Sequence, residues 1–435
     1  MKRFALEKLR EWKDKANRKP LIIRGARQVG KTWLMKEFGR TCFEKVAYVN
    51  FDSNTRMQQV FEGEISIERI VLAISAETGV SIDAKNTLLI FDEVQEVPKA
   101  LSSLKYFCEN APEYTIVSAG SLLGVALHKG TSFPVGKVDF MDLHPLTFQE
   151  FLCALGEERF AEILQGTDME MVTMFKFKYI DRLREYYYVG GMPEVVQTYA
   201  ETKDFNQVRE IQKNLLNYYQ QDFSKHAEIS LVPRLNLVWN SIPMQLAKEN
   251  KKYIYGQVRK GARAKDFELA IQWLLDCGLI HKVQRAGKPA LPLKAYLDLD
   301  VFKIYLLDVG LLMAMTDMDA QVIIDGNRIF TEFKGALTEQ YVLQQLTAMN
   351  CIEPYYYSTK NSGGEIDFLL QGKTSIIPLE VKAEENLRAK SLKAFCEKYN
   401  PKYAIRTSMS DYREQEWMTN IPLYNIDRMK EYLDK

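Results

Sequence analysis

Eight residues near the start of the chain have the types and spacing of a loop that binds phosphate groups. They are Gly25, Ala26, Arg27, Gln28, Val29, Gly30, Lys31 and Thr32. The two glycines let the backbone turn tightly and approach a phosphate with no side chain in the way. Lys31 can reach the β and γ oxygens of a nucleoside triphosphate, and the Thr32 hydroxyl can take one position on Mg²⁺. We therefore expect the eight residues to bind ATP together with Mg²⁺.

A second chemical group follows further along the chain. Residues 87–91 form an apolar run that ends in two acids, Asp92 and Glu93. Asp92 is expected to hold the Mg²⁺, directly or through water. Glu93 is placed to polarise the attacking water, as a general base does in hydrolysis. The alternative is a buried strand that ends in two solvated acids.

A third apolar run, residues 114–118, continues into Ala119, Gly120 and Ser121. In ATPases with an extra strand between the strands that carry the two groups above, a polar residue at this end senses the γ-phosphate. Ser118 and Ser121 are both candidates for that role. An ordinary turn from strand to loop is the alternative.

The elements that must position these residues alternate between short apolar strands and helical stretches up to about residue 150. The expected strands cover 20–24, 46–52, 87–91, 114–118 and 138–143. This alternation indicates a parallel sheet with helices on both faces, and hence an α/β fold class. The glycine loop then joins the first strand to the helix that follows it, as a phosphate-binding loop requires.

The composition limits the classes of function. The chain has 435 residues, enough for two to four domains. Its formal net charge of +1 gives no global attraction for nucleic acid, so any such contact must come from local patches. Its 6 cysteines contain no C-x-x-C pair and histidines number only 4, which argues against a zinc site. No apolar run approaches the roughly 20 residues of a membrane span, and no signal-peptide core follows Met1. We expect a soluble, cytoplasmic protein without membrane contact.

The middle of the chain has two parts. Residues from about 150 to 232 are expected to be mostly helical, with a break at residues 190–193, where Gly-Gly is followed by Met-Pro. After that, helices over 235–247 and 266–277 precede a β-hairpin with its tip at 286–289, which is a winged-helix pattern. Six cations surround it: Lys251, Lys252, Arg259, Lys260, Arg263 and Lys265. They can contact phosphates of DNA, or they can form a solvated face of a packing module.

A second constellation lies near the end of the chain. Glu380 and Lys382 are two residues apart on an expected strand and so point to the same face. Asp367 lies on the preceding strand, which can pair with it as a hairpin neighbour. The two acids and the Val381 carbonyl can hold a divalent cation, and Glu339, from an expected helix, can complete the cage. Lys382 can then orient or deprotonate an attacking water while the metal offsets charge on a scissile phosphate.

The elements around these residues follow a characteristic order. We expect a helix at 333–349, strands at 351–358, 366–370 and 375–383, a helix at 386–399 and a strand at 403–406. Order and residues together resemble the restriction-endonuclease-like superfamily, with its Asp … Glu-x-Lys active site. The resemblance implies a metal-dependent nuclease, and the alternative is the same fold with its chemistry lost or unused.

Taken whole, the chain resembles the bacterial and archaeal family of AAA-type ATPases with a conserved C-terminal domain of undefined function. The motifs that carry the resemblance are the glycine loop and residues 91–95, 119–121, 144–152, 190–194, 305–311 and 364–368. It implies four domains: an AAA-like core at 1–155, a helical lid at 156–232, a winged-helix domain at 233–295 and a restriction-endonuclease-like domain at 296–435. Members often carry an arginine where this chain has Lys137.

Two functions are consistent with these patterns. The first is an ATP-binding and ATP-hydrolysing protein that acts on DNA, with a metal-dependent nuclease domain gated by nucleotide state. The second is a nucleotide-dependent switch whose C-terminal domain only binds a partner. Either function is compatible with a homo-oligomer, and the sequence does not determine the oligomeric state. A kinase or small-molecule transferase is less consistent, because no separate pocket for an acceptor is visible in the sequence.

Overall fold

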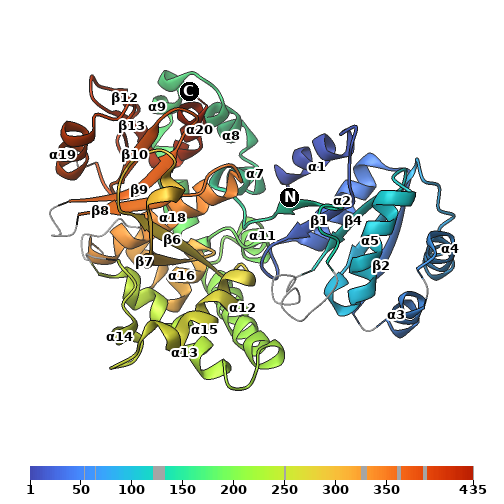
Figure 1. The fold of residues 1–435 in the computed structure, drawn as a ribbon. Coiled ribbons are helices and arrows are strands. Elements are labelled where there is room, and N and C mark those ends of the chain that lie inside the picture. Colours follow the sequence, from blue (N-terminus) through green and yellow to red (C-terminus); the bar gives the residue numbers. More distant parts are fainter. Residues whose placement is uncertain are drawn as a thin grey trace. The chain divides into compact units, whose positions relative to one another are not determined.

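The computed structural model describes residues 1–52, 54–63, 65–120, 133–248, 251–324, 331–359, 364–385 and 389–434 (Figure 1). They form two compact units. One contains Lys2–His144 together with Asp276–Gly278, and the other contains Pro145–Leu275 and the residues from Leu279 onward. No helix in these ranges is long and apolar enough to cross a membrane.

The N-terminal unit is built on a five-stranded sheet in the order β2-β3-β4-β1-β5. The strands are β1 (Leu21–Arg24), β2 (Lys45–Asn50), β3 (Thr87–Asp92), β4 (Thr115–Ala119) and β5 (Asp139–Asp142). Every neighbouring pair is parallel, as the alternating pattern predicts. Strand β4 lies between β1 and β3, so the extra strand expected between the two phosphate-site strands is present.

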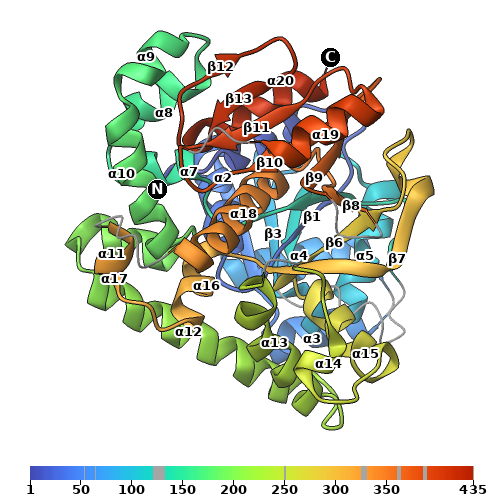
Figure 2. The ribbon, with the colours of Figure 1, turned by 90° about the vertical axis from the view of Figure 1, so that its left-hand side faces the viewer.

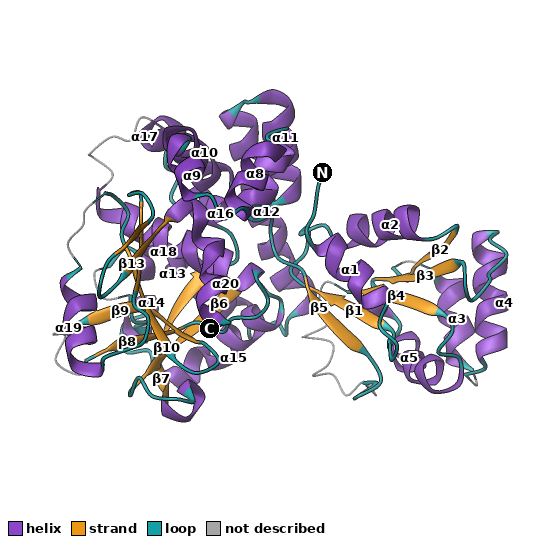
Figure 3. Ribbon diagram, turned by 90° about the horizontal axis from the view of Figure 1, so that it is seen from above, coloured by secondary structure: helices purple, strands orange, loops and turns teal. Residues whose placement is uncertain are grey.

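Helices cover both faces of this sheet, and Figure 3 shows α1 and α2 on one side and α3 and α5 on the other. Their bounds are α1 (Ala5–Lys13), α2 (Lys31–Cys42), α3 (Thr55–Glu62), α4 (Ile67–Thr78) and α5 (Pro98–Asn110), with a 3₁₀ turn η1 (Val94–Glu96). Side chains from α3, α4 and α5 pack on one face of the sheet in a single core. All six residues of β3 are buried, as expected for a strand covered on both sides.

The second unit begins with helices, as predicted. They are α7 (Phe148–Ala154), α8 (Glu158–Gln165), α9 (Met169–Met174), α10 (Lys176–Val189), α11 (Pro193–Thr202) and α12 (Phe205–His226). The predicted break is confirmed, because α10 ends at Val189 and α11 begins at Pro193. Gly190 has φ +76°, and a Cβ built there would lie 2.1 Å from Asp308 Oδ1. Only glycine fits this turn.

Next come three helices and an antiparallel hairpin (Figure 2). These elements are α13 (Val232–Leu246), α14 (Tyr255–Val258), α15 (Ala264–Asp276), β6 (Ile280–Ala286) and β7 (Leu297–Leu306). The predicted hairpin tip at 286–289 is wrong, since the return strand begins only at Leu297. Pro289 and Pro292 have no N–H to donate, so pairing cannot resume between them, and a 3₁₀ turn η2 (Leu293–Tyr296) follows.

The chain ends in a mixed eight-stranded sheet in the order β12-β13-β11-β10-β9-β8-β6-β7. Its elements are α16 (Val309–Met315), α17 (Ala320–Ile324), α18 (Thr331–Ala348), β8 (Tyr355–Ser358), β9 (Glu365–Gln371), β10 (Ile376–Val381), α19 (Lys390–Tyr399), β11 (Ile405–Ser408), β12 (Arg413–Glu414), β13 (Thr419–Pro422), η4 (Leu423–Met429) and α20 (Lys430–Leu433). The order from α18 to β11 is the one that the sequence predicts. Figures 1 and 3 show β9 between α18 and α19.

Candidate functional sites

The glycine loop joins β1 to α2 in the backbone conformation that its sequence predicts. Gly25 has φ +147°, and a Cβ built on it would lie 2.3 Å from the Leu143 carbonyl oxygen. Gln28 also has a positive φ, at 64°. Val29 is fully buried and anchors the middle of the loop. The loop is therefore held by packing as well as by its glycines.

Lys31 is folded back onto the loop. Its Nζ donates to the carbonyl oxygens of Gly25, at 2.9 Å, and Ala26, at 2.8 Å. Burial lowers the pKa of Lys31 to about 8, although the carboxylates of Glu93 and Asp92 oppose that shift. A buried ammonium with two carbonyl acceptors can exchange them for phosphate oxygens, which carry more negative charge.

The two halves of the predicted nucleotide site meet through Thr32 and Asp92. The Thr32 hydroxyl donates to Asp92 Oδ2 at 2.7 Å, across 60 residues of sequence. The Tyr48 hydroxyl donates to the same oxygen at 3.0 Å, and burial together with the Asp92 charge raises the pKa of Tyr48. A hydroxyl and a carboxylate in contact are hard oxygen donors, which fit Mg²⁺.

Glu93 follows Asp92 in a conformation that is rare for a residue with a side chain, with φ +51°. Its N–H donates to Asp92 Oδ1 at 3.1 Å, and Gln95 Nε2 donates to Glu93 Oε2 at 2.6 Å. The turn after β3 thus separates the two acids and orients the Glu93 carboxylate. Sequence reasoning gave no role to Gln95 or to Tyr48.

Arg3 supports the loop from outside the motif. It is buried, and its guanidinium donates to the Val29 carbonyl oxygen at 3.0 Å and to the His144 carbonyl oxygen at 2.7 Å. It therefore ties the glycine loop to the residues after β5. No signal in the sequence identifies it, because one arginine near the first helix looks like a solvated charge.

Ser118, Ser121 and Lys137 are the remaining residues that the sequence singles out in the N-terminal unit. The Ser118 hydroxyl is buried and donates to the Leu21 carbonyl oxygen at 3.1 Å. Ser121 lies outside the described residues. Lys137 forms an ion pair with Glu109 at 2.9 Å. A γ-phosphate sensor at Ser118 or Ser121 stays a prediction.

In the second unit, β9 and β10 bring Asp367 next to the Glu380–Lys382 segment. The Val381 N–H donates to Asp367 Oδ2 at 2.7 Å. Lys382 Nζ pairs with Glu380 Oε1 at 2.7 Å, whereas Glu380 Oε2 is buried without a hydrogen-bond partner. Burial and the charge of Glu339 raise the pKa of Asp367 to about 7. The antiparallel pairing of β10 with β9, in which Leu379 lies opposite Phe368, confirms that the two strands are hairpin neighbours.

Glu339, the predicted helical ligand, is enclosed by cations. It forms an ion pair with Lys251, and Lys303 Nζ lies 3.8 Å from its Oε2. The Tyr305 hydroxyl donates to Oε2 at 3.0 Å. Burial opposes ionisation, but the two ammonium groups lower the pKa of Glu339 to about 2. Lys251 is thus partly withdrawn from the basic patch in which the sequence groups it.

Lys303 is the residue of this cluster that sequence reasoning missed. Its ammonium is fully buried and pairs with Glu365 Oε1 at 2.5 Å. Burial opposes the charged form of Lys303, but the carboxylates of Glu339, Glu365 and Asp367 together raise its pKa. The only available signal is a lysine inside the apolar second half of β7, between Phe302 and Ile304.

Asp367 and Glu380 have donor atoms that fit a divalent cation, whereas Glu339 does not. Among the described residues, no group of three or more His, Cys, Asp or Glu side chains is assembled to hold an ion. The unpartnered Glu380 oxygen and the raised pKa of Asp367 fit a pair of acids that could hold a divalent cation. Glu339 does not fit as it stands, because Lys251 and Tyr305 already take both of its oxygens.

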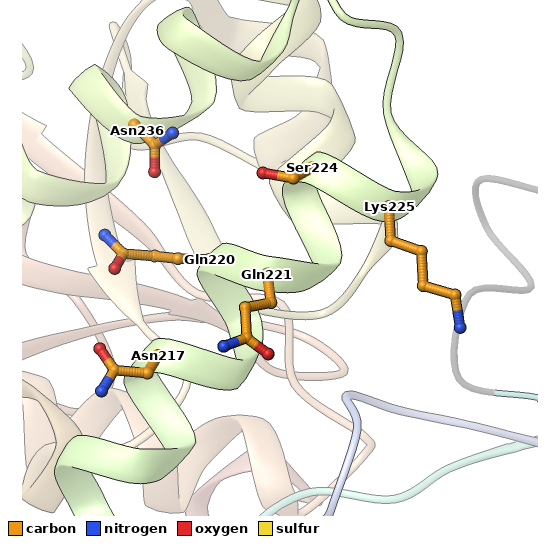
Figure 4. A pocket seen from close by; sticks show the side chains of 6 residues that line it. All are labelled: Asn217, Gln220, Gln221, Ser224, Lys225 and Asn236. Atoms are coloured by element: carbon orange, nitrogen blue, oxygen red, sulfur yellow. The ribbon is translucent and has the colours of Figure 1, made fainter.

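One polar cavity of about 610 Å³ lies on α12 and α13. Figure 4 shows its lining, which is Asn217, Gln220, Gln221, Ser224, Lys225 and Asn236. The lining has amides, one hydroxyl and one ammonium but no acid or thiol. It therefore offers hydrogen bonds to water and no group of the predicted chemistry.

Comparison with known families agrees with this geometry. Residues 17–152 match the model of an AAA domain. These residues therefore form an AAA-type P-loop domain, and the chain continues into a C-terminal domain of unknown function. That C-terminal match covers residues 334–426 (DUF4143), and residues 180–322 match another domain of unknown function (DUF8612). No curated protein matches the sequence.

Several solved structures resemble this AAA-type chain. The Walker-type ATPase PABY2304 of Pyrococcus abyssi is 14% identical, covering 72% of this chain and 94% of its own, with a TM-score of 0.46. The Orc1 protein of Aeropyrum pernix, solved in complex with DNA, is 13% identical over 72% of this chain and 91% of its own, with a TM-score of 0.28. AMPPCP-bound DnaA from Aquifex aeolicus is 13% identical over 63% of this chain and 88% of its own, with a TM-score of 0.29.

Proposed function

We propose that this protein binds and hydrolyses ATP with Mg²⁺ and acts on DNA in the cytoplasm, with a C-terminal metal-dependent nuclease gated by nucleotide state. One observation gives the strongest support to ATP binding, on which the rest of the proposal depends. The 2.7 Å hydrogen bond between Thr32 and Asp92 joins both halves of a nucleotide site. A loop that only resembled a phosphate-binding motif would not need this contact.

The ATPase roles follow from the contacts. Lys31 exchanges the Gly25 and Ala26 carbonyls for β and γ phosphate oxygens. Thr32 and Asp92 would hold Mg²⁺, which when bound offsets the charge that develops on the phosphates. Glu93 accepts the proton of the attacking water. Gln95 holds the Glu93 carboxylate in place through its amide.

The nuclease roles are proposed for the β9–β10 pair. Asp367 and Glu380 would hold a divalent cation, whose chemistry is to offset charge on a scissile phosphate. Lys382 orients or deprotonates the attacking water, once it leaves Glu380. The cations near α14 and α15 supply the DNA contact.

A second function is favoured by a specific observation. Glu339 is neutralised by Lys251 and Lys303, and Lys382 is paired with Glu380. Acids whose charge is already paired with a lysine inside the protein suit a binding module that has no catalysis. In that case the protein is a nucleotide-dependent switch, and the C-terminal domain recognises a partner. In both versions we propose a homo-oligomer, to be checked by sedimentation.

The test incubates the protein with ATP, Mg²⁺ or Mn²⁺, and plasmid or single-stranded DNA. We expect ATP turnover that Lys31→Ala abolishes and DNA cleavage that Lys382→Ala abolishes. Lys393→Ala, at an exposed lysine of α19, is the matched control and should change neither. Turnover without cleavage would select the switch. Unchanged ATP binding by Lys31→Ala in calorimetry would refute the nucleotide site itself.

A further inference from the structure

A cleft of about 440 Å³ in the second unit is lined from two separate elements. One wall is the N-terminal half of α13, and the other is the turn that leads into α15. The lining includes Arg234, Leu237, Arg259, Lys260, Gly261 and Asp266. Cations therefore stand on both walls, one on α13 and two on the turn.

These cations have no acidic partner of their own. Within the residues that the structure describes, Arg234, Arg259 and Lys260 form no ion pair, and all three are exposed. The one acid in the lining, Asp266, accepts a hydrogen bond from the Arg263 N–H at 2.8 Å and so caps the start of α15. Three positive charges face one negative charge, so the cleft carries a net charge of about +2.

The lining also contains apolar surface. Leu237, which is 39% exposed, lies in the cleft beside Arg234. A sugar–phosphate backbone alternates charged phosphates with less polar sugars, so it suits cations that flank an exposed leucine. A membrane surface is flatter and would favour cations on a convex face.

We propose that this cleft holds the sugar–phosphate backbone of a nucleic acid, with Arg234, Arg259 and Lys260 each on a phosphate. The assignment rests on the DNA-acting function proposed above. It adds the position at which the backbone is bound and introduces Arg234, which the sequence alone does not connect with the basic turn.

The experiment measures fluorescence anisotropy of a labelled DNA duplex, without nucleotide, over a series of salt concentrations. We compare wild type with Arg234→Ala, Arg259→Ala and Lys260→Ala. Each variant should reduce the steepness of the plot of log K against log salt concentration by about 0.9, because one phosphate contact is lost. Over the tenfold range from 1 M to 0.1 M salt, the affinity of the variant should therefore rise about eightfold less than that of wild type. Arg159→Ala, at an arginine of α8 that is 91% exposed, removes the same charge elsewhere and should leave the slope unchanged.

The outcomes separate the two proposals. If wild type binds neither DNA nor RNA, the nucleic-acid part of the proposed function fails, and the cleft assignment fails with it. If wild type binds but the three cleft variants and Lys260→Glu bind equally well, only the cleft assignment is overturned. Binding to anionic phosphatidylserine vesicles, lost in the same variants while DNA is not bound, would assign the cleft to a membrane and overturn the proposal. Thermal melting of each variant checks that the exposed substitutions leave the fold intact, and the melting temperatures should match that of wild type.

Discussion

The Glu93 carboxylate is the proposed catalytic group whose position the surrounding contacts define most narrowly. Its backbone is left-handed, its N–H is bound to Asp92, and Gln95 fixes one of its oxygens. A residue in this conformation costs of order 1 to 3 kcal/mol unless its surroundings hold it. That cost is consistent with a role for the side chain at this position.

Replacing Glu93 with Gln should therefore preserve ATP binding and stop hydrolysis. The amide keeps the shape but cannot accept a proton, so turnover should fall roughly 10²- to 10⁴-fold. Phosphate release measures turnover, and calorimetry measures affinity. Glu96→Gln, an exposed acid in the same turn, should behave like wild type. If Glu93→Gln retained its turnover rate, the base would have to be another residue.

A half-buried acid in the second unit, Asp427, gives a prediction about pH. Burial raises the pKa of Asp427 to about 6, the Glu150 charge adds to this, and Lys430 opposes it. The folded state therefore favours the protonated acid. Protonated Asp427 therefore adds to the free energy of unfolding. This contribution is complete below the pKa of the unfolded state, near 3.8, and is lost as the pH rises through 6.

Asp427→Asn should then stabilise the protein above pH 6 by at most about 3 kcal/mol, with little effect near pH 4. Denaturant unfolding of the variant and wild type at both pH values measures the difference. Asp434→Asn, at an acid that is 77% exposed, is the control and should show no such change. Equal destabilisation of Asp427→Asn at both pH values would contradict the assignment.

Local elements were predictable from the sequence to the extent that neighbouring residues determine them. The glycine loop with its strand and helix depends on adjacent residues, and the structure confirms it. The hairpin connection after Ala286 was not, because two prolines delay pairing to Leu297. The Lys303 contacts with Glu339 and Glu365 join residues 36 and 62 positions apart on different elements, and no local pattern encodes them.

Lys251, in the segment before α14, gives a prediction about metal binding at Glu339. Its ammonium pairs with the Glu339 oxygen that the predicted cage would offer to a divalent cation. Lys251→Ala should strengthen Mn²⁺ binding, and it should lower stability because Glu339 keeps only part of its neutralising charge. Calorimetry with Mn²⁺ and thermal melting measure the two effects. In the double variant with Glu339→Gln, the gain in Mn²⁺ affinity should disappear. A Lys251→Ala protein with unchanged Mn²⁺ affinity would exclude competition at Glu339.

The whole chain places its two chemical sites in different compact units. The nucleotide loop belongs to the unit of Lys2–His144, and the β9–β10 acids belong to the other. Gating by nucleotide therefore requires a coupling free energy between the units, typically 1 to 3 kcal/mol for such effects. Contacts within either site say nothing about that energy, so it must be measured directly.

Hydrogen exchange on the Glu93→Gln variant, which should hold ATP without turnover, tests this coupling. With ATP and Mg²⁺, exchange should slow at residues 25–32, because a ligand that binds the folded state protects its site. If the proposed gate exists, exchange in β9 and β10 should also change, by roughly 5- to 150-fold for the coupling energies above. The Lys31→Ala protein, which should not bind ATP, is the control and should show neither change. Protection confined to the N-terminal unit would mean that the acids of the C-terminal domain act independently of the nucleotide, and nucleotide gating would be excluded.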